Sequence, residues 1–243
     1  MRIDVLTLFP EMFTPVRTSI LGRAEEKGIL EITLIDIRDF SNNKHRKTDD
    51  YPFGGGGGMV MTPDPIFSAL EKIKPDSQCR IIYMSPRGRI LDEKKAKELS
   101  ELEEIIILCG HYEGVDQRVL DYFHAEEISI GDYVLTGGEL PAMVLIDCVA
   151  RMLPDVLGNE KSAMDESIYS GLLEHPQYTQ PREYRGMEVP EVLLSGNHKL
   201  INLWKFRESL ILTKERRPDM FAEFVKNPGN LTREEEKILE EIK

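Results

Sequence analysis

The sequence predicts an α/β protein whose larger part is built around a parallel β-sheet, with a small helical unit after it. Three segments with strand character, at 80–84, 104–108 and 126–130, are each followed by a glycine- or proline-containing turn and then by a segment with helical spacing. This alternation is typical of a parallel sheet that helices cover on both faces. It favours an ordinary doubly wound architecture.

The beginning of the chain supplies two more strands and one helix. Residues 2–8 form an apolar run that ends before Pro10, which predicts a buried strand. Helical spacing over 15–27 stops at Gly28, and glycine is common just after a helix. Residues 29–37 alternate and are rich in β-branched side chains, which predicts a second strand.

A long loop is expected over 39–64, and it carries the glycine run 54–58. The run has no Lys-Ser/Thr at its end and follows a loop rather than a strand, so it does not indicate a P-loop. Ordering five glycines costs backbone entropy. Close approach of the backbone to a ligand and a plain flexible loop both account for the run.

Three strand–turn–helix units come next. The first unit consists of a strand at 80–84, a turn at 85–88 and a helix at 92–100. The second has its strand at 104–108, its turn at 109–114 and its helix at 116–123. The third has its strand at 126–130, its turn at 131–138 and its helix at 141–153. Asp92 is a typical N-cap, and Pro141 is expected at the first helical position. Ligands bind at the carboxyl ends of parallel strands, so the loops 85–89, 109–114 and 130–138 are predicted to converge on one site.

The loop 130–138 has the most informative composition of the three. Its glycines allow backbone groups to reach a flat ring, and Tyr133 and Leu135 offer apolar walls for such a ring. A tight turn between a strand and a helix accounts for the same residues, because short glycine motifs often occur without a ligand. The composition of this loop alone therefore leaves both a ligand site and a tight turn open.

Regular patterning is lost after Pro154, and residues 158–170 are predicted to be a flexible linker. The remaining part, 171–243, reads as a small helical domain. A helix is expected over 198–212, a short one after Pro218, and a last one whose capping box pairs Thr232 with Glu235.

Composition excludes several classes of protein. The chain has 243 residues, of which 41% are hydrophobic, so disorder of the whole chain is not expected. Cys79, Cys109 and Cys148 are far apart and form no C-x-x-C pair, which indicates reduced thiols rather than a zinc knuckle or a disulfide framework. No signal peptide or membrane-length apolar run is recognisable, so we expect a cytoplasmic protein without membrane contact.

The net charge of −12 argues against nucleic-acid binding through overall charge. Two local basic clusters, 44–47 and 214–217, remain candidates for phosphate contacts. The sequence has no G-x-S-x-G, no H-E-x-x-H and no spaced His/Cys set, so neither a nucleophilic triad nor a metal site is predicted. Taken alone, Arg151 reads as a helix C-terminal cation, and Asp165 and Glu166 as solvated carboxylates.

Several ordered motifs make the chain recognisable, and together they cover nearly its whole length. They are LFPEMF at 8–13, RDF at 38–40, HRKTDD at 45–50, GGGGGM at 54–59, SPRG at 85–88, GHYEGVD at 110–116, SIGDYVLTGGELP at 129–141 and LLSGNH at 193–198. In this order they closely resemble the bacterial tRNA (guanine-N(1)-)-methyltransferase family, whose members are trefoil-knotted (SPOUT) methyltransferases.

The resemblance changes the expected fold. It implies a parallel-sheet domain over 1–157 with a deep C-terminal trefoil knot near 109–138, the linker 158–170, and a helical tRNA-binding domain over 171–243. Threading is so rare that pattern alone does not predict a knot. The resemblance also implies a homodimer whose active sites are shared between subunits, with tRNA rather than DNA as its partner.

The resemblance further implies that S-adenosylmethionine is the methyl donor. The residues that would bind it are Pro86, Gly110, Glu113, Ile130, Gly131, Asp132, Tyr133, Val134, Leu135, Gly137, Gly138 and Pro141. Substrate tRNA would meet Asp49, the glycine run, Arg151 and the C-terminal domain. The implied methyl acceptor is N1 of the guanine immediately 3′ of the anticodon, when the preceding base is also guanine.

Catalysis then needs a base for the N1 proton and a cation near the guanine O6. The resemblance assigns these roles to a linker carboxylate and to Arg151. Glu166 stands where the family has Asp, and its neighbour Asp165 is the second candidate for the base. His111 replaces a usual Arg, and Gly57 a frequent Pro. Mg²⁺ is implied in catalysis, but no ligand set places it.

Two alternatives remain at this point. One is a knotted methyltransferase that modifies a different RNA position, such as a ribose hydroxyl or a ribosomal base. The other is a non-catalytic RNA-binding protein that kept the fold, which would be expected to have lost the cofactor loop or the pair of Arg and carboxylate. The cofactor loop and Arg151 are both present here, which favours an enzyme.

Overall fold

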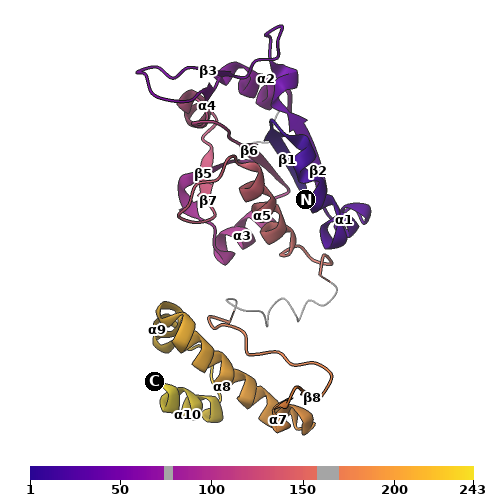
Figure 1. The fold of residues 1–243 in the computed structure, drawn as a ribbon, viewed down its shortest axis with the longest axis vertical. Coiled ribbons are helices and arrows are strands. Elements are labelled where there is room, and N and C mark those ends of the chain that lie inside the picture. The colour runs from indigo at the N-terminus through magenta and orange to yellow at the C-terminus, as the bar shows by residue number, and fades with distance from the viewer. Residues whose placement is uncertain (74–78, 158–169) are drawn as a thin grey trace. The chain divides into compact units, whose positions relative to one another are not determined.

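A computed structural model describes residues 1–73, 79–157 and 170–243 of the chain. The chain divides into two compact units, Met1–Gly158 and Asn159–Lys243, each of which is considered by itself (Figure 1).

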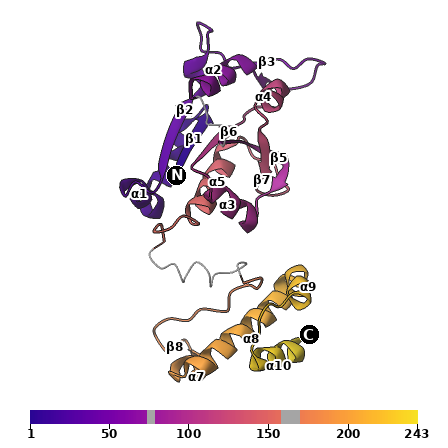
Figure 2. The ribbon, with the colours of Figure 1, turned by 180° about the vertical axis from the view of Figure 1, so that it is seen from behind.

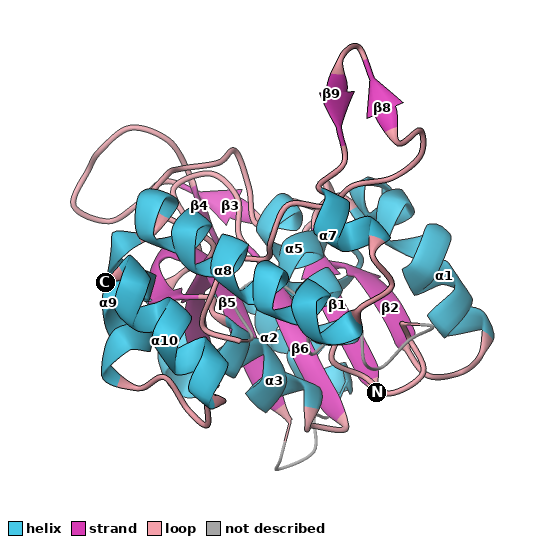
Figure 3. Cartoon of the chain, turned by 90° about the horizontal axis from the view of Figure 1, so that it is seen from below, coloured by secondary structure: helices cyan, strands magenta, loops and turns pink. Residues whose placement is uncertain are grey.

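The first unit contains a five-stranded sheet with the strand order β2-β1-β6-β5-β7. Its strands are β1 (Arg2–Thr7), β2 (Glu31–Asp36), β5 (Arg80–Ile90), β6 (Glu104–Cys109) and β7 (Glu126–Ser129). Every neighbouring pair is parallel, as the alternating pattern predicts. Figure 3 shows β5, β6, β1 and β2 lying side by side.

Helices cover both faces of this sheet, because its strands are apolar on both sides (Figure 1 and Figure 2). On β6, Ile105, Ile107 and Cys109 face one core cluster, and Ile106 and Leu108 face the other. The first cluster includes α1 (Ser19–Glu26), α3 (Glu93–Ser100) and α5 (Glu139–Ala150). The second includes the 3-10 helix η2 (Ile37–Phe40), α2 (Pro63–Ile73) and α4 (Gln117–Tyr122).

The prediction of a helix over 15–27 is wrong for its first residues. A 3-10 helix, η1 (Pro10–Arg17), precedes α1, and Thr18 between them is extended. Pro15 lies inside η1, and proline removes an amide donor and clashes with the preceding turn of an α-helix. The α-helix therefore begins only after this proline.

The loop expected over 39–64 is also more structured than its sequence indicates. It contains a short antiparallel pair, β3 (Asp49–Asp50) and β4 (Val60–Met61), and α2 begins at its end. The turn expected over 85–88 belongs to β5, whose register against β7 shifts between Met84 and Arg89. Helix α5 begins at Glu139 rather than Pro141, which still lies in the first turn, where no amide donor is needed.

The second unit is mainly helical where the structure describes it. It contains α7 (Glu191–Leu194), α8 (His198–Arg216), α9 (Pro218–Lys226) and α10 (Arg233–Ile242), with a hairpin of β8 (Glu183–Tyr184) and β9 (Met187–Glu188). Its own small core gathers Leu172, Leu210, Phe221 and Leu239. Within the described ranges, no helix is long and apolar enough to cross a membrane.

The start of α10 carries the predicted capping box. The Glu235 amide donates to the Thr232 hydroxyl at 3.3 Å, and the Thr232 amide donates to the Glu235 carboxylate at 2.8 Å. Thr232→Ala is expected to lower the free energy of unfolding of this unit by about 1 kcal/mol, because the Glu235 amide loses its acceptor. Denaturant unfolding followed by circular dichroism measures this. Thr232→Ser keeps the hydroxyl and should unfold like the parent; an equal loss in both variants would contradict the prediction.

Candidate cofactor site

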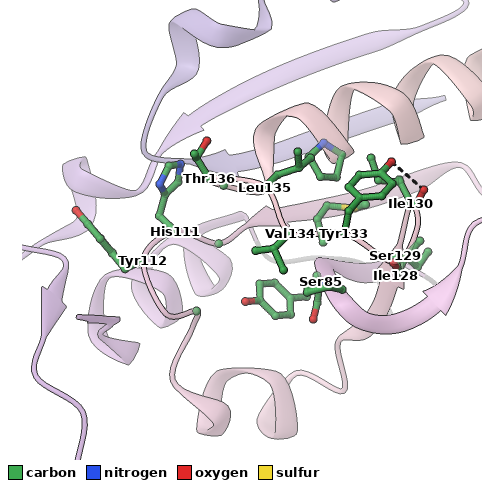
Figure 4. Close-up of a pocket in the computed structure, with 18 of the residues that line it drawn as sticks. Ser85, His111, Tyr112, Ile128, Ser129, Ile130, Tyr133, Val134, Leu135 and Thr136 are labelled. Carbon is green, nitrogen blue, oxygen red and sulfur yellow. Dashed lines mark hydrogen bonds between the residues drawn. The ribbon is translucent and has the colours of Figure 1, made fainter. Parts of the chain in front are cut away.

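A cavity of about 230 Å³ lies at the carboxyl ends of the strands β5, β6 and β7. Three segments line it: Tyr83 to Pro86 from β5, 110–114 after β6, and residues of 128–138 together with Pro141 (Figure 4). The three loops therefore converge on one cavity, as predicted.

Most of the residues that the resemblance assigns to the cofactor line this one cavity. They are Pro86, Gly110, Glu113, Ile130, Gly131, Tyr133, Val134, Leu135, Gly137, Gly138 and Pro141. Asp132 belongs to the same loop but does not line the cavity. Tyr83, Ser85, Ser129 and Thr136 also line it, although the sequence assigned none of them an individual role.

The edge of the cavity forms where the turn before α5 packs directly on the end of β6. The Gly138 amide donates to the Gly110 carbonyl at 2.9 Å. A Cβ on Gly138 would lie 2.8 Å from the Cys109 Cα and 2.9 Å from the Gly110 nitrogen. Both neighbours are backbone atoms, so this contact requires glycine.

Apolar side chains lie at the mouth of the cavity. Val134 is 84% exposed and Tyr133 is 54% exposed, and the Tyr133 hydroxyl donates to the Ile130 carbonyl at 3.1 Å (Figure 4). Clustered exposed apolar groups at the rim of a cavity are typical of a ligand-binding surface. A ligand that covered them would remove their apolar surface from water.

Two buried titratable groups lie near the end of β6, and both are held neutral. Burial raises the pKa of the Tyr83 hydroxyl, while the nearby Arg87 charge opposes that shift. Burial also raises the pKa of the Cys109 thiol well above its usual value, and the charge of Glu139 raises it further. The cavity therefore contains a neutral phenol, and Cys109 beside it is an unreactive thiol rather than a nucleophile.

A polar network that local sequence patterns did not predict lies beside the turn. The Thr7 hydroxyl donates to Glu139 Oε1 at 2.7 Å, and His111 Nε2 lies 2.8 Å from Glu139 Oε2. Glu139 is 1% exposed. Thr7 and Glu139 are 132 residues apart in the chain, so no local pattern could have joined them.

The glycine run and Asp49 connect to the rim of the cavity through backbone pairing. Asp49 pairs with Met61 in the β3–β4 hairpin, and the Met61 amide donates to the Gly114 carbonyl at 2.9 Å. A Cβ on Gly58 would lie 2.4 Å from Glu113 Oε1. The backbone at Gly58 thus approaches a cavity residue closely, although Asp49 itself does not line the cavity.

Arg151 is not brought to the cavity within one chain. It caps the C-terminal end of α5, about 18 Å along the helix from Glu139 at roughly 1.5 Å per residue. There it contributes to the environment of Cys148, whose thiol pKa is raised by burial and by Asp147 and is lowered by the Arg151 charge. Asp165 and Glu166, the two candidates for the base, lie outside the described residues.

Several cations of the basic clusters pair with carboxylates of the same chain. Arg46 forms ion pairs with Asp36 and Asp39. Arg217 pairs with Asp219 at 2.6 Å, and its hydrogen bond lowers the pKa of Asp219 to about 2. A phosphate group would have to compete with these partners. Among the residues that the structure describes, no group of three or more His, Cys, Asp or Glu side chains could hold a metal ion.

A cavity between turns at the carboxyl ends of a parallel sheet lies where α/β domains usually bind their ligands. Residues 1–223 match the family described as tRNA (Guanine-1)-methyltransferase TrmD. The chain belongs to this family, which confirms the resemblance seen in its motifs. It is therefore an enzyme of the methyltransferase class, and membership of this family implies S-adenosylmethionine as the methyl donor.

Curated relatives agree over nearly the full length. A protein named tRNA (guanine-N(1)-)-methyltransferase from Clostridium perfringens (strain SM101 / Type A) is 53% identical over 239 residues, which cover 98% of this chain and 99% of the relative. The protein of that name from Alkaliphilus oremlandii is 55% identical over 251 residues, which cover 100% of this chain and 99% of the relative. The protein of that name from Staphylococcus carnosus is 52% identical over 244 residues, which cover 100% of this chain and 98% of the relative.

Proposed function

We propose that this protein transfers a methyl group from S-adenosylmethionine to N1 of the guanine immediately 3′ of the anticodon, in tRNAs whose preceding base is also guanine. The observation that carries the proposal is the cavity at the strand ends. It is lined by nearly every residue that the family resemblance assigns to the cofactor, and the chain matches the family over residues 1–223.

The residues of the cavity suit this cofactor. Backbone groups of the loop 130–138 can meet the polar edge of an adenine, and Ile130 and Leu135 can meet its faces. The volume of about 230 Å³ lies below the roughly 300–1,000 Å³ of sites that enclose ligands of this size. A bound cofactor would therefore extend past the exposed rim at Tyr133 and Val134.

The chemistry requires positioning more than activation. S-adenosylmethionine supplies an already activated methyl group when it is bound. Glu166, with Asp165 as the alternative, accepts the proton of guanine N1. The electron pair left on N1 then forms the new N–C bond as the S–C bond breaks. Arg151 stabilises the negative charge that develops toward O6 of the base. Holding both reactants in line lowers the barrier further.

The proposal includes a homodimer in which Arg151 serves the active site of the partner subunit. Its distance of about 18 Å along α5 from Glu139, at the cavity end of the helix, supports action on another site. Helix α5 also exposes Leu140 (48%) and Val144 (43%), one turn apart on the same side of the helix. Apolar groups placed in this way are typical of a surface that a partner covers.

Arg151→Ala is expected to slow methyl transfer in the homodimer, and a mixed dimer should recover activity. A Gly138→Val protomer has a damaged cavity but an intact Arg151, whereas an Arg151→Ala protomer has the reverse. If Arg151 acts across the interface, their heterodimer has one complete site. The two chains are co-expressed with different tags, purified through both and assayed beside each variant homodimer. An inactive heterodimer would contradict action across the interface, and an unimpaired Arg151→Ala homodimer would refute a catalytic role.

The deep trefoil knot also belongs to the proposal. Two close backbone approaches support it: Gly138 packs on the Cys109 backbone, and a Cβ on Gly88 would lie 2.3 Å from the Glu127 carbonyl carbon. The remaining assignments place tRNA on Asp49, the glycine run 54–58 and the domain 171–243. Mg²⁺ is included as an aid to catalysis, without assigned ligands.

Phosphate contacts from the basic clusters would make tRNA binding depend on salt. Lys44→Gln is expected to reduce the slope of log K against log salt concentration by about 1, because one fewer counterion is released. Filter binding across a salt series measures this. Lys97→Gln on α3, outside both clusters, serves as the control. Equal slopes for the parent and Lys44→Gln would exclude a contact from this lysine.

Methyl transfer from labelled S-adenosylmethionine to bulk tRNA, followed by nucleoside analysis, tests the main proposal. The expected product is N1-methylguanosine at the position after the anticodon. A tRNA whose preceding guanine is replaced should accept little label. Label in a ribose hydroxyl or in another base would instead favour the alternative, a knotted methyltransferase with a different RNA target.

A further inference from the structure

Glu139 is a buried carboxylate that joins three elements around the cavity. It begins α5, and it contacts Thr7 at the end of β1 and His111 just after β6. Thr7 is 0% exposed and does not line the cavity, whereas His111 does. The network therefore runs from the interior of the domain to the cavity wall.

The direction of each hydrogen bond follows from its neighbours. The Phe9 amide donates to the Thr7 hydroxyl at 2.9 Å, so the single hydroxyl proton is left for Glu139 Oε1 at 2.7 Å. A carboxylate oxygen accepts, so the network uses the His111 tautomer whose Nε2 donates to Glu139 Oε2 at 2.8 Å. The Phe9 ring lies 4.8 Å from the His111 ring, centroid to centroid, and limits its rotation.

The cofactor turn packs directly on this pair. A Cβ on Gly137 would lie 2.2 Å from His111 Nε2 and 2.6 Å from Glu139 Oε2. Gly137 and His111 also pair as an isolated antiparallel bridge. A shift of the carboxylate or of the imidazole therefore moves the backbone that borders the cavity.

A buried carboxylate is costly unless it is fully hydrogen-bonded, and an apolar residue often gives equal stability. The amides at the start of α5 favour a negative charge there. What the carboxylate adds over an apolar residue is direction, because its two oxygens hold two segments at set distances. Its placement is therefore better explained by geometry at the cavity than by stability.

We infer that Thr7, Glu139 and His111 form a positioning network that holds the Gly137–Gly138 turn in the shape that binds the cofactor. None of the three needs to touch the reacting atoms. The inference rests on the proposed function, because it assumes that S-adenosylmethionine occupies this cavity. It assigns Thr7, which does not line the cavity, a measurable part in cofactor affinity.

Thr7→Val removes the hydroxyl with little change in shape, and Thr7→Ser keeps it. Thr7→Val is expected to weaken binding of S-adenosylmethionine by about tenfold or more and to raise its KM, because small displacements at a site are costly. The KM for tRNA should not change. Thr7→Ser should bind the cofactor like the parent. Isothermal titration, steady-state kinetics and thermal unfolding are measured on the full chain.

A second pair of variants keeps the test decisive if Thr7→Val folds poorly. His111→Leu removes the donor to Glu139, whereas His111→Arg supplies another, since a guanidinium donates readily to carboxylates. Rescue of cofactor affinity by arginine but not by leucine is the expected result. Parent-like affinity in Thr7→Val, or equal losses in His111→Leu and His111→Arg, would overturn the inference alone. Absence of cofactor binding by the parent protein would overturn the proposed function and the inference with it.

Discussion

Replacing Glu166 by glutamine is expected to lower the single-turnover rate of methyl transfer by about a hundredfold or more. Guanine N1 carries a proton and is a poor nucleophile until that proton leaves. Glutamine has the same shape as glutamate but cannot accept the proton. The dissociation constant of S-adenosylmethionine should stay near that of the parent, because Glu166 has no assigned role in the cofactor cavity. Labelled cofactor with saturating tRNA measures the rate, and isothermal titration measures the affinity.

Asp165→Asn is the matched control, since it makes the same chemical change one residue earlier. It should leave the single-turnover rate much less affected than Glu166→Gln. The opposite result, in which Asp165→Asn lowers the single-turnover rate more than Glu166→Gln does, would show that Asp165 is the base. Raising the pH should partly restore the rate of Glu166→Gln, because N1 then loses its proton to solvent without a protein base.

Replacing Gly138 by valine is expected to abolish measurable cofactor binding and to destabilise the first unit. The new Cβ would lie 2.8 Å from the Cys109 Cα and 2.9 Å from the Gly110 nitrogen. Because β6 is buried on both faces, its end cannot retreat, so the turn before α5, which lines the cavity, must move away from β6. Overpacking of this kind costs about 1–3 kcal/mol. Thermal unfolding and titration with S-adenosylmethionine measure the two effects.

Gly57→Val provides the control for a glycine in open space. A Cβ there meets no atom within 4 Å, and Gly57 does not have a left-handed backbone conformation. Its unfolding midpoint and cofactor affinity should match those of the parent. Cofactor binding by Gly138→Val at parental strength would show that the turn between Gly137 and α5 is not part of the cofactor site.

Much of the fold follows from local patterns in the sequence. Within the predicted strand 104–108, residues 105–108 are apolar on both sides, which is typical of a buried parallel strand, and β6 is one. The glycine- and proline-rich turns after three such strands predict a site at the strand ends, and the cavity lies there. Local patterns did not predict α2. Its first residue is a proline and a glycine-rich segment precedes it, and both features are typical of a loop.

The sequence by itself determined the parallel sheet, the place of the cavity and the family, since each depends on residue types at short spacing or on their order. Only the tertiary structure decided which distant groups meet. It joined Thr7 to Glu139 across 132 residues, and it placed Arg151 at the far end of α5 from the cavity. The physical reason is that hydrogen bonds and excluded volume act between neighbours in space. Spacing along the chain constrains such neighbours only within a single helix, strand or turn.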